Sequence, residues 1–218
     1  MIERFIHRVA TDIPDPAETA ATARMRLGEK FPRTALRRMT HLGLLTGSAL
    51  DGIALTPEDT LVYATTFAET RALEDFLVSF PVASPLLFQT SIHPGGVQQV
   101  MIGRQQPVGR LWPLAGGPRL VEHALQTVLL DPAARVVLAG GEERGTWMLE
   151  LGMAAAQPFA FAVEFTREAA AALGKISFTP GDENDAPCPT LENFARALPS
   201  RMPLGWRGAG GAWAVTWS

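Results

Sequence analysis

The sequence lacks most of the features that characterise secreted, membrane-spanning or nucleic-acid-binding proteins. It has one cysteine, which can form neither an internal disulfide nor a cysteine-based zinc site. Its 19 basic and 22 acidic side chains give a net charge of −3, which excludes a surface-wide basic footprint for nucleic acid. No apolar run approaches the ~18 residues of a membrane span, and the N-terminus is too short and too charged for a signal peptide. These absences predict a cytoplasmic protein.

Apolar sequence, in contrast, is abundant. Of the 218 residues 47% are hydrophobic and 19% charged, whereas about 25% are charged in an average globular chain. This composition excludes intrinsic disorder, and the length allows one large domain or two small ones. We expect one domain over residues 1–180. Residues 181–218 are expected to form a C-terminal extension, with a loop, a short helix and a final strand packed on the same domain.

The apolar pattern of the first half predicts alternating strands and helices. Strands are expected over residues 2–9 and 60–66, and a helix over residues 34–45. A weaker helical pattern covers residues 91–103. Another helix, ended by a proline, is indicated by an i, i+3, i+4, i+7 stripe that consists of Leu73, Phe76, Leu77 and Phe80.

The second half has a clearer strand–helix–strand pattern. Strands are expected over residues 108–115 and 136–139, on either side of a helix that starts near Pro118. The apolar stripe of this helix consists of Val121, Ala124, Leu125, Val128 and Leu129. This spacing predicts a βαβ unit in a buried parallel sheet. The remaining expected elements are strands at 159–165, 176–178 and 213–217 and helices at 166–173 and 190–198.

Common catalytic and cofactor-binding motifs are absent. The sequence contains no phosphate-binding loop, no strand-linked GxGxxG, no HExxH and no GxSxG, so we expect neither a cofactor nor a metal. The four histidines are far apart, and His123 lies off the apolar stripe of its helix, where it is expected to be exposed. Cys188 lies in an acidic loop, whose charge disfavours a reactive thiolate.

Four segments, in their order and spacing, resemble the N-terminal domains of β-ketoacyl synthase-like proteins. Residues 84–93 (SPLLFQTSIH) are similar to the family's SPxxFxxSVHN stretch, and residues 107–124 lie where the family has the strand that ends at its nucleophile. Residues 136–142 (VVLAGGE) resemble the VMVAGGAE strand. Residues 161–176 resemble the strand and helix that close the first half of a thiolase-like fold. The resemblance covers roughly residues 1–180 and is to chain-length-factor-like proteins that accompany polyene gene clusters.

Together with the βαβ spacing, this resemblance implies an α/β fold. The expected architecture is a thiolase-like half, with a mainly parallel five-stranded sheet covered by helices on both faces. The second thiolase half is not expected in this chain.

The resemblance also implies that the nucleophile is missing. Counting back about 25 residues from Gly140, the family's spacing, gives Ala115 and Gly116, neither of which can attack a thioester. The family's two catalytic histidines belong to its second half, so His93 is not one of them. After His93, where the family continues with an NAA-like sequence, this chain has residues 94–96 (PGG). We expect no catalytic residue.

A non-catalytic partner of a ketosynthase is the function that the resemblance implies. The pair would act with an acyl carrier protein in fatty-acid or polyene (polyketide-type) biosynthesis. An acyl or oxyanion pocket would involve Ser91, His93, Trp112, Ala115, Gly116 and Gly117, and the wall of an acyl tunnel Leu86, Leu87, Phe88 and Trp112. Dimerisation, as a homodimer or with a ketosynthase, would use the strand residues Val108, Leu111, Trp112 and Leu114.

Other interpretations remain open from the sequence. The chain could be a stand-alone acyl-thioester hydrolase that uses Ser91 and His93, or an acyl-binding scaffold without a fixed partner. Gly116 and Gly117 could open an oxyanion site at a helix N-terminus or could simply permit a tight turn. The C-terminal strand at 213–217 could cover the dimer strand within one chain.

Overall fold

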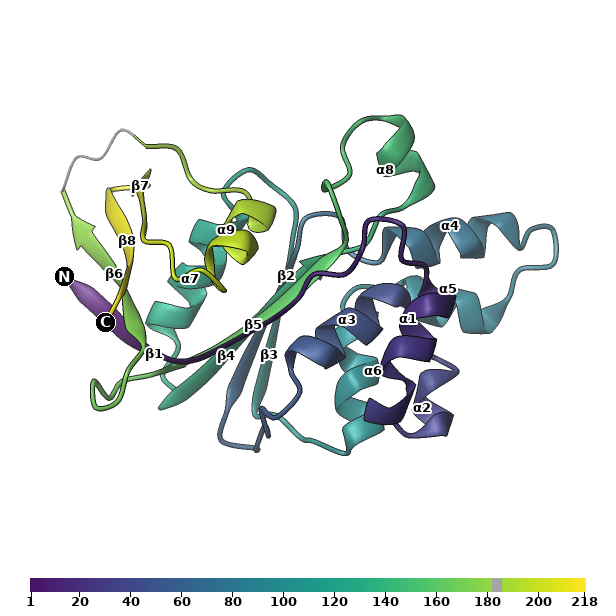
Figure 1. The fold of residues 1–218 in the computed structure, drawn as a ribbon, viewed down its shortest axis with the longest axis horizontal. Helices are drawn as coiled ribbons and strands as arrows, with labels where there is room; N and C mark the ends of the chain where they lie inside the picture. Colours follow the sequence, from purple (N-terminus) through teal and green to yellow (C-terminus); the bar gives the residue numbers. More distant parts are fainter. Residues whose placement is uncertain (182–185) are drawn as a thin grey trace.

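The computed structural model describes residues 1–181 and 186–218, and within them one sheet carries helices on both faces (Figure 1). The strand order is β3-β2-β4-β5-β1-β6-β8-β7. The strands are β1 (Ile2–Asp12), β2 (Thr60–Thr65), β3 (Arg110–Ala115), β4 (Arg135–Glu142), β5 (Phe159–Thr166), β6 (Gly174–Pro180), β7 (Leu204–Gly208) and β8 (Gly211–Trp217). The helices are α1 (Ala20–Leu27), the 3-10 turn η1 (Gly28–Lys30), α2 (Arg33–Leu36), α3 (His41–Ala49), α4 (Thr70–Val78), α5 (Pro85–Ser91), α6 (Gly95–Arg104), α7 (Leu120–Leu130), α8 (Thr146–Glu150) and α9 (Leu191–Ala197).

The prediction of a mainly parallel five-stranded sheet is wrong, although the α/β class and the helices on both faces are confirmed. The sheet of the described residues has eight strands, and β2 pairs in parallel with β3 and β4 while the other five pairings are antiparallel. The segment between β4 and β5 contains only the short helix α8, and β7 and β8 are joined by a tight turn. Such connections reverse the chain, whereas a parallel pairing needs a crossover.

The central strands are buried on both faces, so each contributes to two cores. Val62 and Ala64 of β2 face the core beneath α7 and α9, and Leu61 and Tyr63 face the core beneath α1, α3 and α6. This alternation follows from the two-residue period of a strand. It explains why β2 and β4 form nearly continuous apolar runs in the sequence.

Several predicted elements are confirmed. The stripe of α7 is buried and His123 is exposed, β5 covers its predicted range, and Thr190 caps α9 by accepting the Asn193 N–H at 3.1 Å. The predicted 34–45 helix is wrong, because the chain breaks after Leu36 and restarts at α3, where Thr40 accepts the Gly43 N–H at 3.0 Å. The predicted helix at 166–173 is wrong as well, since Ala171 has a positive φ of 59°.

The apolar stripe of α4 faces away from the core of the protein. Leu73 and Leu77 are exposed, while Ala72 and Glu74 are buried. Periodicity alone predicts an apolar face but not what covers it.

The C-terminal segment extends the same sheet at the end away from β3. β8 pairs with β6, and β7 pairs with β8. Trp206 and Trp213 stack with ring centroids 5.8 Å apart, and both indoles belong to the core beneath α7 and α9. β7 was not predicted from the sequence, and part of the predicted loop after β6 lies outside the described residues.

Phe161 offers a test of the core beneath α7 and α9. Its ring is fully buried and contacts that of Phe194 edge-on at 5.5 Å. Phe161→Ala leaves a cavity and should lower the free energy of unfolding by about 3–5 kcal/mol in urea denaturation. Val82→Ala, at a residue that is 83% exposed, should change it by less than about 0.5 kcal/mol. An equal loss in both variants would contradict this packing.

Candidate functional site

The carboxyl ends of the parallel strands β2, β3 and β4 lie side by side and form the carboxyl edge of the sheet. Thr65, the last residue of β2, lies opposite Ala115, the last residue of β3. Gly116 and Gly117 follow with φ of 78° and 86°, a left-handed conformation that glycine adopts without strain. At this turn, where the resemblance expects the nucleophile, no side chain can attack a thioester.

The backbone of this turn is already hydrogen-bonded in part. The Gly116 N–H donates to the Thr65 carbonyl oxygen at 3.1 Å, so it is not directed at a ligand. The helix α7 begins only at Leu120, whose N–H donates back to the Gly117 carbonyl oxygen at 3.3 Å. The glycines therefore make a tight turn between β3 and α7.

Ser91 and His93 do not form a nucleophile–base pair. The Ser91 hydroxyl donates to the Phe88 carbonyl oxygen at 2.8 Å, which ends α5. The Nδ1 atom of His93 lies 3.2 Å from Oε2 of Glu69, and its ring stacks on Tyr63 with centroids 5.3 Å apart. Among the described residues, no hydroxyl or thiol is hydrogen-bonded to His93.

Glu69 positions His93 from within the protein. Its side chain is fully buried, and Oε1 accepts the Gly96 N–H at 2.8 Å. The other ring nitrogen of His93, Nε2, is buried and has no partner in the described part of the chain. A carboxylate-oriented imidazole is a component of an acid–base site, but the nucleophile that such a site needs is not beside it.

Buried glutamates surround this edge of the sheet, and sequence reasoning missed them. Glu142 accepts the N–H groups of Thr66 and Phe67, directly after β2. Glu143 accepts the N–H of Leu42 at 3.2 Å and that of Arg71 at 3.0 Å, in the first turns of α3 and α4. The signal was present in the sequence, because two adjacent glutamates directly follow the apolar run of β4.

Glu74 forms the same kind of contact from α4. Its carboxylate accepts the N–H groups of Thr146 and Trp147 at 2.9 Å each, at the start of α8. Together with Glu69, Glu142 and Glu143, it binds five segments: the loop after β2 and the first turns of α3, α4, α6 and α8. Burial raises the pKa of Glu142 and of Glu143 to about 7.

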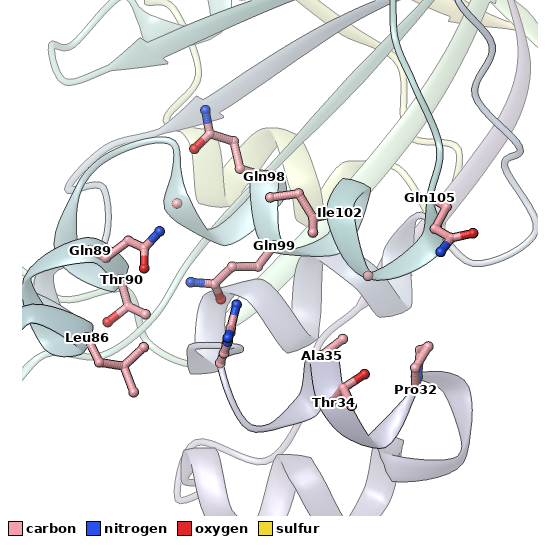
Figure 2. A pocket seen from close by; sticks show the side chains of 13 residues that line it. Pro32, Thr34, Ala35, Leu86, Gln89, Thr90, Gln98, Gln99, Ile102 and Gln105 are labelled. Atoms are coloured by element: carbon pink, nitrogen blue, oxygen red, sulfur yellow. The ribbon is translucent and has the colours of Figure 1, made fainter.

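The proposed tunnel-wall residues lie on two separate elements. Leu86 lines a hollow of about 410 Å³ between α2, α5 and α6 (Figure 2), and Ser91, His93 and Trp112 do not line it. Trp112 lies on β3, where its Nε1 donates to Oδ2 of Asp131 at 3.1 Å and its side chain is 46% exposed. This hollow is therefore lined by one of the expected tunnel-wall residues, and the expected acyl or oxyanion pocket stays a prediction.

The surroundings of Cys188 do not activate its thiol. Burial raises the pKa of the Cys188 thiol, which disfavours the thiolate. No group of three metal-binding side chains occurs in the ranges that the structure covers, 1–181 and 186–218. Across the same ranges, no helix has the length and apolar character needed to cross a bilayer.

Comparison with known proteins gives no family model and no curated protein that matches the sequence. Solved structures, in contrast, are similar. A chain of the ketosynthase ApeO in complex with its chain length factor ApeC, from Xenorhabdus doucetiae, has a TM-score of 0.69 at 16% identity, over 99% of this chain and 100% of that one. The chain has the fold of ketosynthase and chain length factor subunits. The resemblance seen in the sequence is confirmed at the level of the fold.

Two further structures support this assignment of the fold. The ishigamide ketosynthase/chain length factor has a TM-score of 0.56 at 14% identity, over 83% of this chain and 68% of that chain. The AntDE:AntF assembly is a type II PKS acyl-carrier protein in complex with its ketosynthase. It has a TM-score of 0.58 at 13% identity, over 85% of this chain and 70% of that chain. At such identities the similarity establishes the fold alone.

The raised pKa of the buried glutamates predicts how stability depends on pH. An unfolded glutamate has a pKa of about 4.5, whereas Glu143 has one of about 7, so the folded state binds more protons between these values. This group therefore lowers the free energy of unfolding as pH rises from about 4.5 to 7, by an amount on the order of a few kcal/mol. In chemical denaturation across this pH range, the free energy of unfolding should decline less steeply with pH for Glu143→Gln than for the unmodified protein. Glu150→Gln, an exposed control, should keep the original slope.

Proposed function

We propose that this protein is a non-catalytic, chain-length-factor-like subunit that pairs with a ketosynthase and acts on chains held by an acyl carrier protein. The pathway class is fatty-acid or polyene (polyketide-type) biosynthesis, in the cytoplasm. The observation that carries the proposal is an uncovered edge strand, β3, which ends in Ala115 and Gly116 where the resemblance expects a nucleophile.

The edge strand β3 is available for pairing. It bonds to β2 on one side only, and its outer side has no neighbour within the described chain. Trp112 and Pro113 are exposed on it, and Arg110 supplies its charge. The C-terminal strand β8 does not cover β3, because it pairs with β6 and β7 at the other end of the sheet. An exposed apolar edge favours pairing with another chain.

A second exposed apolar surface lies on α4, α5 and the segment between them. Phe76 contacts the rings of Phe80 and Phe88 with centroids 5.3 Å apart, yet Phe80 is 55% and Phe88 52% exposed. Leu77 and Val82 are exposed beside them. Contiguous exposed apolar side chains mark sites that a partner or ligand covers.

The comparisons support the same proposal without deciding it. The similar structures named above include complexes of a ketosynthase with a chain length factor, and one complex of a ketosynthase with an acyl-carrier protein. The alternative function, a stand-alone hydrolase, has less support, because Ser91 and His93 are hydrogen-bonded to different residues and not to each other. An acyl-binding scaffold without a fixed partner is an outcome of the experiments that follow.

Substitutions on β3 test the partner surface. The purified chain should be a dimer in light scattering, and Trp112→Lys, at an exposed position, should raise its dissociation constant at least about tenfold by placing a charge in the contact. Leu111→Asp should also convert the dimer to monomer or aggregate, but its half-buried side chain packs against the core beneath α3 and α6 as well, so this variant also tests the fold. Leu149→Asp on α8 is the matched control and should leave the dimer intact. A wild-type chain that stays monomeric at high concentration, alone and with ketosynthase, refutes the proposal.

The missing nucleophile gives a second test. Neither the wild-type chain nor Ala115→Cys should form a carbon–carbon bond from acyl and malonyl thioesters, because the family's histidine pair is absent from this site as well. Mass spectrometry of the products measures this. Robust condensation by the wild-type chain alone would contradict the proposal, whereas slow hydrolysis would not.

A further inference from the structure

A hollow of about 460 Å³ lies where the N-terminal turns of α1, α3 and α4 converge beside α5. Thr19 and Thr40, the N-caps of α1 and α3, line it, and Ala72 lines it from the first turn of α4. The first-turn N–H groups of Leu42 and Arg71 already donate to Glu143, so the attraction of this space for a further anion depends on the arginines that line it. The volume is that of a small-molecule pocket.

Arginines from distant segments gather around this space, which we name the arginine hollow. Its arginines are Arg24, Arg37, Arg38, Arg71 and Arg144. Arg71 pairs with Glu74 and Asp75, but the other four form no ion pair with a carboxylate among the described residues. Because the chain as a whole has a net charge of −3, this positive charge is a local concentration.

The acidic groups that face the hollow are largely engaged or neutralised. Glu18 is held by Arg26 at 2.7 Å and by His41 at 3.4 Å, and Asp75 is more than half exposed. Burial raises the pKa of Glu143 to about 7, so it carries only part of a charge near neutral pH. Burial lowers the pKa of His41, which therefore contributes little positive charge itself. The arginines determine the sign of the field.

Arg144 adds an unsatisfied donor. Its Nη1 donates to the Pro16 carbonyl oxygen at 3.0 Å, but its Nε is buried and lacks a partner in the described residues. Arg24, in contrast, is held by the carbonyl oxygen of Met39 at 2.9 Å, which fixes its guanidinium at the rim. The Arg144 guanidinium therefore lies beside the hollow with one hydrogen bond to the backbone and no carboxylate partner in the described residues.

The hollow described above between α2, α5 and α6 adjoins the arginine hollow. The two share Arg38, Leu86 and Thr90. The second one, which we name the glutamine hollow, has side-chain amides from α5, α6 and the residue after α6, namely Gln89, Gln98, Gln99 and Gln105 (Figure 2). Amide groups donate and accept hydrogen bonds without charge, so they suit an uncharged polar group.

We propose that the two hollows bind a phosphate ester, with its phosphate at the arginines and its uncharged, hydrogen-bonding remainder along the glutamines. Phosphate has three terminal oxygens and accepts bidentate contacts from several guanidinium groups, which a single carboxylate cannot do. The site does not involve β3, so its test needs no ketosynthase and is independent of the function proposed above.

Isothermal titration of the full chain at constant ionic strength tests this proposal with glucose 6-phosphate, inorganic phosphate and glucose. Both phosphates should bind and glucose should not. Arg38→Gln should weaken the binding of both phosphates about tenfold or more, because it removes a charge-assisted contact. Arg33→Gln is the matched control: it makes the same charge change five residues earlier, in α2, at a residue that lines neither hollow.

A further pair of measurements separates the two parts of the site and the two sources of phosphate. Gln98→Ala should weaken the binding of glucose 6-phosphate but not the binding of inorganic phosphate. A phosphoserine peptide separates the two sources of phosphate. If it binds more tightly than glucose 6-phosphate, the ligand is a phosphate carried by a protein; if it does not, the ligand is a free metabolite. The proposal is overturned if no phosphate binds, or if Arg33→Gln weakens the binding of phosphate as much as Arg38→Gln does. It is also overturned if Gln98→Ala leaves the binding of glucose 6-phosphate unchanged. Thermal denaturation should show that these variants remain folded, since all three side chains are exposed.

Discussion

Four buried carboxylates hold together the carboxyl edge of β2 and β4 and the helices that start there. Glu69, Glu74, Glu142 and Glu143 accept backbone N–H groups from the loop after β2 and from the first turns of α3, α4, α6 and α8. An unpaired buried carboxylate would be strongly unfavourable, so these groups and the donors they satisfy must remain together. The orientation of His93 by Glu69 and the placement of the first turns of α3 and α4 beside the arginine hollow depend on this arrangement.

The two edge strands of the sheet, β3 and β7, have different surroundings. The β7–β8 hairpin extends the sheet beyond β6, and the indoles of Trp206 and Trp213 are part of the core there. Trp112 is exposed on β3, and the exposed rings of Phe80 and Phe88 form a second apolar surface. These exposed apolar side chains support the association proposed above.

The molecule also separates its surfaces by chemistry. The edge strand and α4–α5 are apolar, whereas the space between the starts of α1, α3 and α4 is lined by arginines. Apolar surfaces bind by excluding water and have little preference for a charged group, whereas guanidinium groups select anions. The phosphate site proposed above does not involve β3, although α4 and α5 contribute residues to it as well as to the exposed apolar surface.

The sequence by itself determined which segments are buried and that the turn after β3 carries no nucleophilic side chain. The stripe of α7, the apolar runs of β2 and β4 and the alternation of β5 follow from local periodicity, which burial requires whatever the topology. Ala115 and Gly116 exclude nucleophilic chemistry by their side chains alone.

Tertiary structure decided the rest. The direction of β5, the outward face of α4 and the burial of Glu142 and Glu143 depend on which segments lie beside them. The arginine hollow joins residues 24, 37–38, 71 and 144, and no local pattern relates them. Periodicity records how each segment divides between apolar and polar faces, whereas its neighbours are selected by long-range packing of the whole chain.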